Sequence, residues 1–247
     1  MTIAAPATFQ TVPLDTALRP AQLVSRDFLT PGYVRVRLAG EALHGFSAPG
    51  ADDHVRIFFA AGGGPVPEGP DQWRELPSRE YTPVAADAGW VDFDLVIHGE
   101  GPGSAWAASG PLGSWVAVAG PRRSNAVLGE PDAWFLAGDE TAVPAINRFL
   151  RGRRPGTPAR VLLEVAAENE PVPLNSDSAA HVTILVRGED SLASTLARLG
   201  ERDRPEGSVL GFVAGEAAVV PAARALLLDR WGLPAEAVIT KGYWRRD

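Results

Sequence analysis

No cysteine occurs among the 247 residues of the chain, which has only one methionine and one lysine, Lys241. Without cysteine the protein has no disulfide bond, no cysteine-ligated zinc, no catalytic thiolate and no iron–sulfur cluster held by its own side chains. Any redox chemistry must therefore come from a bound cofactor.

Long apolar runs and an excess of basic residues are missing as well. No segment approaches the length of a membrane span, and the first residues lack the basic-then-apolar order of a secretion signal, so we expect a cytoplasmic protein. The net charge of -7 argues against broad binding of nucleic acids. The hydrophobic content of 45% is typical of a globular protein, and the length suits two modest domains.

The first half of the chain has the pattern of a small antiparallel β-barrel. Residues 1–19 show no clear period and are interpreted as a loose arm that leads to a first strand near 21–26. Period-two patterns and short apolar runs predict further strands at 33–38, 54–59, around Arg79, at 90–98 and at 115–119. One helix is predicted near 104–109, and the Gly- and Pro-rich segment 61–77 is predicted to be a long loop.

Asp92 and Asp94 alternate with Phe93 and Leu95 in one of these strands. Successive side chains of a strand point to opposite faces, so we expect both carboxylates on a solvated face. As a pair they do not suggest an acid–base dyad.

The second half changes to an alternation of strands and helices after a linker that ends near residue 131. Strands are predicted at 133–137, 160–167, 181–187, 208–214 and 237–243. Helices are predicted at 143–151, at 191–199 with Ser191 as N-cap, and at 217–231. This alternation indicates a doubly wound parallel sheet.

The stretch from Arg79 to Trp106 carries the first candidate site. Arg79 and Tyr81 share one face of a strand, while Thr82 points to the other side or toward the strand end. Arg offers a fork of donors to phosphate, Tyr a ring for stacking and Thr a hydroxyl for a ring nitrogen. Gly101, Gly103 and Ser104 then open a helix, whose free N–H groups attract phosphate. The combination suits a flat cofactor with a pyrophosphate tail; the alternative is a strand, a turn and a capped helix without ligand.

The second candidate site follows the first strand of the α/β half. Gly138-Asp139-Glu140-Thr141 lies between a strand and a helix, where ligands of such sheets bind. It is not the Gly-x-Gly-x-x-Gly fingerprint, and its carboxylates would repel phosphate. A role near a nicotinamide ring or in holding the loop is therefore favoured, beside the alternative of acidic residues that complement a helix dipole. The junction at 211–217 has the same position, and its Gly215 would allow a ligand close to the backbone.

Two further segments bear on ligands. Glu168 and Glu170 follow the second strand of this half, where an acidic side chain favours a free ribose 2′-OH, and they favour NADH over NADPH. The C-terminal residues 241–246 place aromatic rings beside cations, which suits a planar cofactor or an anionic aromatic ligand. The alternative is a final strand whose Trp244 packs over a barrel edge, with a solvated basic tail.

The motifs in this order resemble those of the siderophore-interacting proteins, flavin-dependent ferric-siderophore reductases of the ferredoxin-reductase-like superfamily. The resemblance covers nearly the whole chain. It rests on Arg79-Glu80-Tyr81-Thr82, Val96-Ile97-His98-Gly99, Gly101-Pro102-Gly103-Ser104-Ala105-Trp106-Ala107, Gly138-Asp139-Glu140-Thr141-Ala142-Val143-Pro144-Ala145 and Gly242-Tyr243-Trp244-Arg245. One departure is Val84, at a place where the family often has a basic residue.

This resemblance implies an N-terminal antiparallel Greek-key β-barrel that binds FAD, residues 1–123. It also implies a C-terminal α/β domain that binds NAD(P)H, residues 131–247, whose last segment returns to the flavin. The implied reaction reduces a ferric siderophore and releases Fe(II). The residues implied to bind cofactor are Arg79, Tyr81, Thr82, Val96, His98, Gly101, Gly103, Ser104, Trp106, Asp139, Glu140, Thr141, Ala142 and Trp244. Those implied to contact the ferric chelate are Lys241, Arg245 and Arg246.

Two other functions fit the same residues. One is a flavin reductase on this scaffold that is fed by a ferredoxin or serves another acceptor. The other is a siderophore-binding protein without turnover. His44, His54 and His181 are isolated in the sequence, so no metal site is expected.

Overall fold

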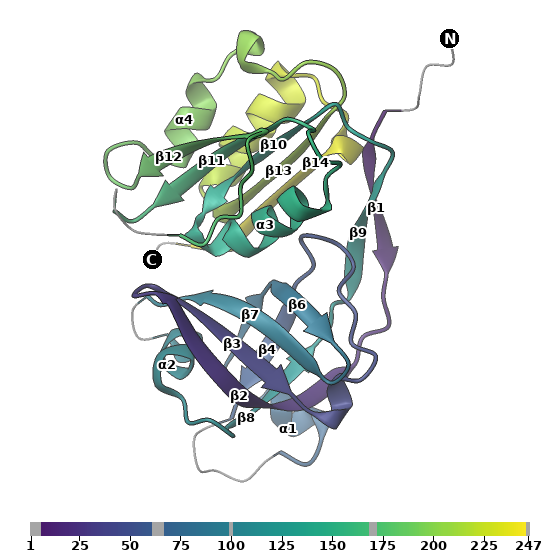
Figure 1. Ribbon diagram of the computed structural model, residues 1–247, viewed down its shortest axis with the longest axis vertical. Helices are drawn as coiled ribbons and strands as arrows, with labels where there is room; N and C mark the ends of the chain where they lie inside the picture. Colours follow the sequence, from purple (N-terminus) through teal and green to yellow (C-terminus); the bar gives the residue numbers. More distant parts are fainter. Residues whose placement is uncertain (1–5, 61–66, 99–100, 168–171, 246–247) are drawn as a thin grey trace. The chain divides into compact units, whose positions relative to one another are not determined.

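The computed structural model describes residues 6–60, 67–98, 101–167 and 172–245. The chain divides into two compact units, one of Thr11–Asn125 and the other of Met1–Gln10 with Ala126–Asp247 (Figure 1). Among the helices of the described ranges, none is long and apolar enough to cross a membrane.

The N-terminal unit is built on a seven-stranded antiparallel sheet with the order β5-β4-β8-β2-β3-β7-β6. Its strands are β2 (Leu18–Thr30), β3 (Tyr33–Ala39), β4 (Val55–Phe59), β5 (Ser78–Tyr81), β6 (Pro83–Asp87), β7 (Trp90–Val96) and β8 (Trp115–Ala119). The two edge strands, β5 and β6, are separated along the chain by Thr82 alone. The sheet must therefore curl until its edges meet at this residue, which confirms the predicted antiparallel barrel architecture.

Short helices complete the unit: η1 (Glu41–Leu43), α1 (Pro70–Arg74) and α2 (Pro102–Ser109). The predicted loop 61–77 thus contains helix α1, whose Trp73 is buried, while residues 61–66 lie outside the described ranges. The inner face of the sheet is apolar, with Leu23, Val36, Ile57, Phe93 and Val118 each 0% exposed.

The prediction that Asp92 and Asp94 lie on a solvated face is wrong. Both are 5% exposed, because Arg35 and Arg37 of the neighbouring strand β3 cover them. Each guanidinium donates two hydrogen bonds to its carboxylate, at 2.7 and 2.8 Å. Arg37 also stacks over the ring of Trp90, 3.9 Å from its centroid. The alternation correctly gave the outer face, but the cross-strand pairing removes the carboxylates from water.

The interpretation of residues 1–19 as a loose arm and of the segment up to residue 131 as a linker is also wrong in part. Strands β1 (Thr8–Pro13) and β9 (Arg123–Leu128) form a separate two-stranded sheet. Thr11 donates from its hydroxyl to the side-chain oxygen of Asn125 at 2.7 Å. The two segments are more than a hundred residues apart, so neither shows its partner in the local sequence.

The C-terminal unit has a five-stranded parallel sheet with the order β12-β11-β10-β13-β14. Its strands are β10 (Ala133–Asp139), β11 (Ala159–Val165), β12 (Ala180–Val186), β13 (Val209–Glu216) and β14 (Val238–Trp244). Its helices are η2 (Glu140–Ala142), α3 (Val143–Gly152), α4 (Leu192–Arg198), η3 (Glu201–Asp203), α5 (Val219–Arg224), the π-helix η4 (Ala225–Arg230) and η5 (Ala235–Ala237). The chain runs outward from β10 in one direction and then in the other, which confirms the predicted doubly wound sheet.

Helices cover both faces of this sheet: α3 lies on one face and α4 on the other (Figure 1). On one face the ring of Phe149 packs 4.9 Å from that of Phe212, and on the other Trp231 packs 4.9 Å from Phe135. Because β10 is covered on both sides, its residues from Ala133 to Ala137 form an unbroken apolar run.

The helix predicted over 217–231 changes its winding partway. It is an α-helix to Arg224 and a π-helix from Ala225, and the N–H of Trp231 donates to Leu226 O, five residues earlier, at 2.8 Å. The Trp231 indole thereby donates to Gly200 O at 2.8 Å while its ring stays against the core. The N-cap predicted for α4 is confirmed, since the Ser191 hydroxyl accepts from Ser194 N at 3.1 Å.

Candidate functional site

Strand β5 positions the first group of predicted site residues. Arg79 lies opposite Ile57 and Tyr81 opposite Val55 of β4, whereas Glu80 points to the other face and pairs with Arg56 at 2.6 Å. Arg79 is exposed and donates to its neighbour's carbonyl, Ser78 O, at 2.8 Å. In the described part of the chain no carboxylate forms an ion pair with Arg79, so its guanidinium keeps donors for an anion.

Tyr81 lies against the first turn of helix α2. A Cβ built on Gly103 would stand 2.0 Å from the Tyr81 hydroxyl and 3.2 Å from its Cζ, so only glycine leaves room for the phenol. Burial raises the pKa of Tyr81 to about 12, although the charge of Arg79 opposes the rise. The phenol therefore stays neutral near physiological pH. Thr82 is buried at the point where the two sheet edges meet.

The N-terminus of α2 is suited to an anion. Gly101 is its N-cap, Pro102 stands in the first turn, and no side chain caps the helix or places a carboxylate in that turn. The first N–H groups of a helix have no partner within it, and they favour negative charge. The Ser104 hydroxyl is used otherwise: it accepts from the backbone N–H of His98 at 2.9 Å and ties the end of β7 to the helix.

The opposite end of α2 is held by Arg26, which the sequence analysis missed. Its Nε donates to Ala107 O at 2.6 Å, and its Nη2 donates to Trp106 O at 3.2 Å and to Gly110 O. A cation at this end complements the helix dipole and satisfies terminal carbonyls. Arg26 lies on β2, about 80 residues earlier, so no local signal could have revealed it.

Trp106 and Val96, like Tyr81, were predicted to contact the cofactor, but their surroundings differ from those of Tyr81. Trp106 is 8% exposed in the core of the barrel, with its ring 5.2 Å from Phe59 and its Nε1 donating to Ser114 Oγ at 3.1 Å. Val96 is half-buried at the end of β7, and the side chain of His98 beyond it is exposed.

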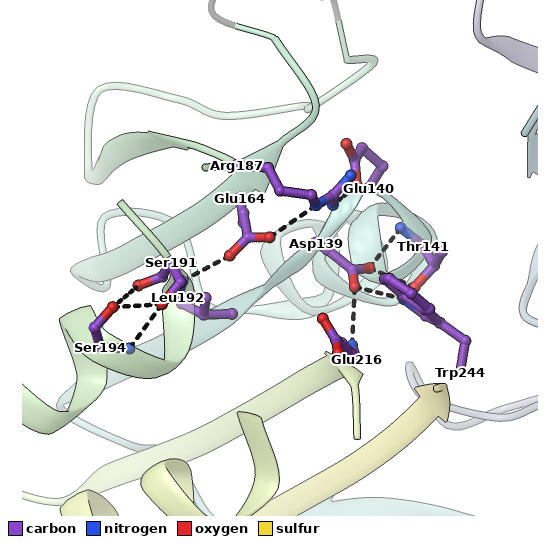
Figure 2. A network of polar contacts seen from close by, with 10 residues as sticks. All are labelled: Asp139, Glu140, Thr141, Glu164, Arg187, Ser191, Leu192, Ser194, Glu216 and Trp244. Atoms are coloured by element: carbon purple, nitrogen blue, oxygen red, sulfur yellow. Dashed lines mark hydrogen bonds and ion pairs between the residues drawn. The ribbon is translucent and has the colours of Figure 1, made fainter. Parts of the chain in front are cut away.

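At the carboxyl end of the parallel sheet, Asp139 is the centre of a polar network (Figure 2). Its Oδ1 accepts from the N–H of Thr141 at 2.9 Å and from the Thr141 hydroxyl. Its Oδ2 accepts from Glu216 N at 2.9 Å and from the indole Nε1 of Trp244 at 2.7 Å. Burial raises the pKa of Asp139, and the hydrogen bonds from Thr141 and Trp244 oppose that rise.

Arg187, at the end of β12, joins two further carboxylates in the same network (Figure 2). It contacts Glu140 at 2.6 Å and Glu164 at 2.9 Å, and its Cζ lies 6.0 Å from the ring centroid of Trp244. Burial lowers the pKa of Arg187, but the bonds to both carboxylates outweigh burial, and the pKa is raised. Glu164 also accepts from Leu192 N at 2.6 Å, at the start of α4.

Two glycines of this edge make room for side chains of the protein itself. Gly215 has φ +151, and a Cβ there would stand 2.6 Å from Asp139 Oδ2. The sequence predicted that Gly215 admits a ligand; the group that approaches it is the Asp139 carboxylate. A Cβ on Gly138 would stand 2.4 Å from the Cβ of Ala142, which is fully buried.

The remaining residues that were predicted to contact ligands lie at other positions. In β14, Lys241 is half-buried opposite Ala214, and Arg245 beyond the strand is exposed. Glu168, Glu170 and Arg246 lie outside the described residues.

Comparisons with known proteins cover both units. Residues 22–125 match the siderophore-interacting FAD-binding domain, and residues 131–247 match the siderophore-interacting protein family. The chain is 30% identical over 243 residues to the ferric vibriobactin reductase ViuB of Vibrio cholerae, covering 92% of this chain and 89% of that protein. It is 33% identical over 154 residues to the NADPH-dependent ferric-chelate reductase of Escherichia coli, covering 57% of this chain and 59% of that protein.

Among solved structures, a siderophore utilization protein from T. fusca superposes with a TM-score of 0.81 at 28% identity, covering 97% of this chain and 96% of that chain. These matches confirm the family and the fold class expected from the motifs, and the match to an FAD-binding domain agrees with the expected cofactor.

Proposed function

Because the chain belongs to the siderophore-interacting protein family, we propose that it reduces ferric siderophores with electrons from NAD(P)H and releases Fe(II) in the cytoplasm. The observation that carries this proposal is the arrangement of Tyr81, the Arg79 guanidinium and the start of α2, whose first turn has no carboxylate, on adjoining elements. The named activities of the Vibrio cholerae and Escherichia coli relatives support it.

The residues present fit FAD. Tyr81 offers an aromatic face, and its contact with Gly103 places that ring beside the helix start, as a flavin with a pyrophosphate tail requires. Arg79 would hold the pyrophosphate with the N–H groups of Gly103 and Ser104, and Thr82 would hydrogen-bond the ring. The positions that would border the flavin are Val96, His98, Gly101 and Trp244.

The chemistry follows from the electron count. A nicotinamide gives up two electrons as a hydride and ferric iron takes one, and bound FAD supplies the conversion between them. Fe(II) binds the hard oxygen ligands of a siderophore far less tightly than Fe(III), so reduction releases the metal. The chain needs no general acid or nucleophile for this; its residues would hold and orient the flavin.

We further propose that residues 1–123 form the FAD-binding domain, and that residues 131–247 bind the donor and return their last segment to the flavin. Lys241, Arg245 and Arg246 would contact the anionic ferric chelate. Asp139, Glu140, Thr141 and Ala142 would border the donor through the loop that they hold.

The test mixes purified protein with FAD and a ferric siderophore in the presence of a ferrous chelator that reports Fe(II). NADH, NADPH and reduced ferredoxin are supplied in turn, which also identifies the donor. We expect a yellow protein that produces Fe(II) with at least one nicotinamide nucleotide. A protein that stays colourless with FAD contradicts the proposal, and turnover with ferredoxin alone contradicts the donor.

A matched pair of arginines tests the flavin site. Arg79→Gln should weaken FAD binding about 10- to 100-fold, as expected for loss of a charged hydrogen bond to phosphate. Arg56→Gln is the control, because Arg56 is exposed on the neighbouring strand and engages Glu80. Equal FAD affinities of the two variants would show that Arg79 does not hold the pyrophosphate.

A further inference from the structure

The strand order of the parallel sheet reverses at β10. Strand β10 lies between β11 and β13, and the crossovers lead away from it in opposite directions. In doubly wound sheets a dinucleotide binds at the carboxyl ends of the strands beside this point. Its pyrophosphate is held there by backbone N–H groups and hydroxyls.

In this chain the donors at that place already hold an anion, the carboxylate of Asp139 (Figure 2). They come from three segments: the N–H and hydroxyl of Thr141, the N–H of Glu216 at the end of β13, and the indole of Trp244. Three of these four groups are N–H donors, which cannot accept a proton, so the arrangement is that of an ionised carboxylate. Asp139 is 3% exposed, and the absence of a side chain at Gly215 gives its Oδ2 room.

The charges around this carboxylate also disfavour a second anion. The guanidinium of Arg187 is engaged by Glu140 at 2.6 Å and Glu164 at 2.9 Å, and both carboxylates have little exposed surface. With Asp139, the polar groups at this edge include three carboxylates, and two of them already engage the guanidinium of Arg187. A pyrophosphate arriving here would meet repulsion and donors that are already bonded.

We propose that Asp139 is a specificity-determining residue: its carboxylate occupies the pyrophosphate position of the C-terminal unit and lowers the affinity of the protein for dinucleotides. The proposal rests on the nicotinamide donor of the proposed function. The donor then binds through its nicotinamide end and through groups elsewhere, and its pyrophosphate contributes little.

The rival explanation is that Asp139 only fastens the C-terminal strand through Trp244. Substitution of Asp139 would then act by releasing the indole. Trp244→Phe separates the two, because it removes the indole donor and leaves the carboxylate in place.

The probe is ADP-ribose, which carries the pyrophosphate and both riboses but no nicotinamide, and its binding is measured by calorimetry on the FAD-loaded protein. We expect Asp139→Ser to bind ADP-ribose about 10- to 100-fold more tightly than the unchanged protein, because a buried like charge has been removed and its donors are vacant. Trp244→Phe should bind ADP-ribose no more tightly than the unchanged protein. Should Asp139→Ser fail to fold, Asp139→Asn removes the charge but still fills the space, and it should bind ADP-ribose more tightly than the unchanged protein by a smaller factor.

A kinetic measurement accompanies the binding. Asp139→Ser should lower the KM for NADH by a similar factor, and should lower it by more than the KM for N-benzyl-dihydronicotinamide, which has no phosphate. Unchanged ADP-ribose affinity in a folded Asp139 variant overturns the inference, and so does equal tightening in Trp244→Phe. Failure of the proposed function would give a different result. Neither NADH nor N-benzyl-dihydronicotinamide would reduce the flavin, while substitution of Asp139 would still change the affinity for ADP-ribose.

Discussion

Replacing Gly103 by alanine tests the contact that brings the Tyr81 ring to the start of α2. The new Cβ would lie 2.0 Å from the Tyr81 hydroxyl, well inside van der Waals contact, so the ring or the helix must move. Overpacking of this kind costs about 1–3 kcal/mol. Alanine is preferred to glycine inside a helix by at most about 1 kcal/mol. The clash outweighs that gain, and we expect the unfolding free energy of the apoprotein to fall by about 1–2 kcal/mol.

The Tyr81→Phe background provides the control, because it removes the clashing oxygen and leaves the ring. The nearest atoms to the new Cβ are then the ring Cζ of residue 81 at 3.2 Å and Phe59 Cζ at 3.3 Å, which need to shift by only a few tenths of an ångström. Gly103→Ala should then be neutral or stabilising, which gives a coupling energy of about 1–3 kcal/mol between the two positions.

The assay is urea unfolding of the four apoproteins: unchanged, each single variant and the double variant. A coupling below about 0.5 kcal/mol, within the usual additivity of independent sites, would refute the argument. If the ring yields instead of the helix, phenolate absorbance should show the pKa of Tyr81 falling from about 12 toward the value of an exposed tyrosine. FAD affinity should fall in Gly103→Ala in either case and recover in the double variant.

Three further outcomes are expected from the N-terminal unit. Asp94→Ala should lower the unfolding free energy by about 2–4 kcal/mol, since Arg35 loses its two hydrogen bonds to a buried carboxylate. Glu80→Ala, which breaks the exposed pair with Arg56, should cost under about 1 kcal/mol in the same urea series. Arg26→Met should cost about 1–2 kcal/mol by calorimetry, because carbonyls at the end of α2 lose their donor; no change would show that the cation is dispensable. The pKa of Tyr81 is about 12 in the folded protein and about 10 in the unfolded chain. The stability that this difference gives is therefore complete below about pH 10 and is lost as pH rises through about 12. Over this range the unfolding free energy of the unchanged apoprotein should fall by up to about 3 kcal/mol more than that of Tyr81→Phe.

Local signals in the sequence were sufficient where neighbours along the chain make the structure. Ser191 caps α4 because its hydroxyl reaches an N–H three residues ahead. The strand with Arg79 and Tyr81 and the helix start at Gly101 followed in the same way, from a period of two and from glycine and proline at a turn.

Contacts between distant segments were not predictable, because a local sequence pattern does not indicate which distant residue a side chain will contact. Asp94 alternates like a solvent-facing residue, and only the pairing of β7 with β3 places Arg35 over it. Arg26 reaches α2 because β2 passes beside the helix. The same reason applies to Gly215: the sequence shows a glycine after a strand but not the Asp139 carboxylate that lies close to it.

Periodicity, turn chemistry and short motifs were enough to predict the two sheets, the family and the position of the α2 helix start. Which groups remain available to ligands depends on contacts between segments that are distant in the sequence. Trp244 and Asp139 are 105 positions apart, and their hydrogen bond forms because parallel strands end at one edge of the sheet. The hydrogen-bond donors at this edge are bonded to the Asp139 carboxylate because the fold brings the ends of β10, β13 and β14 together.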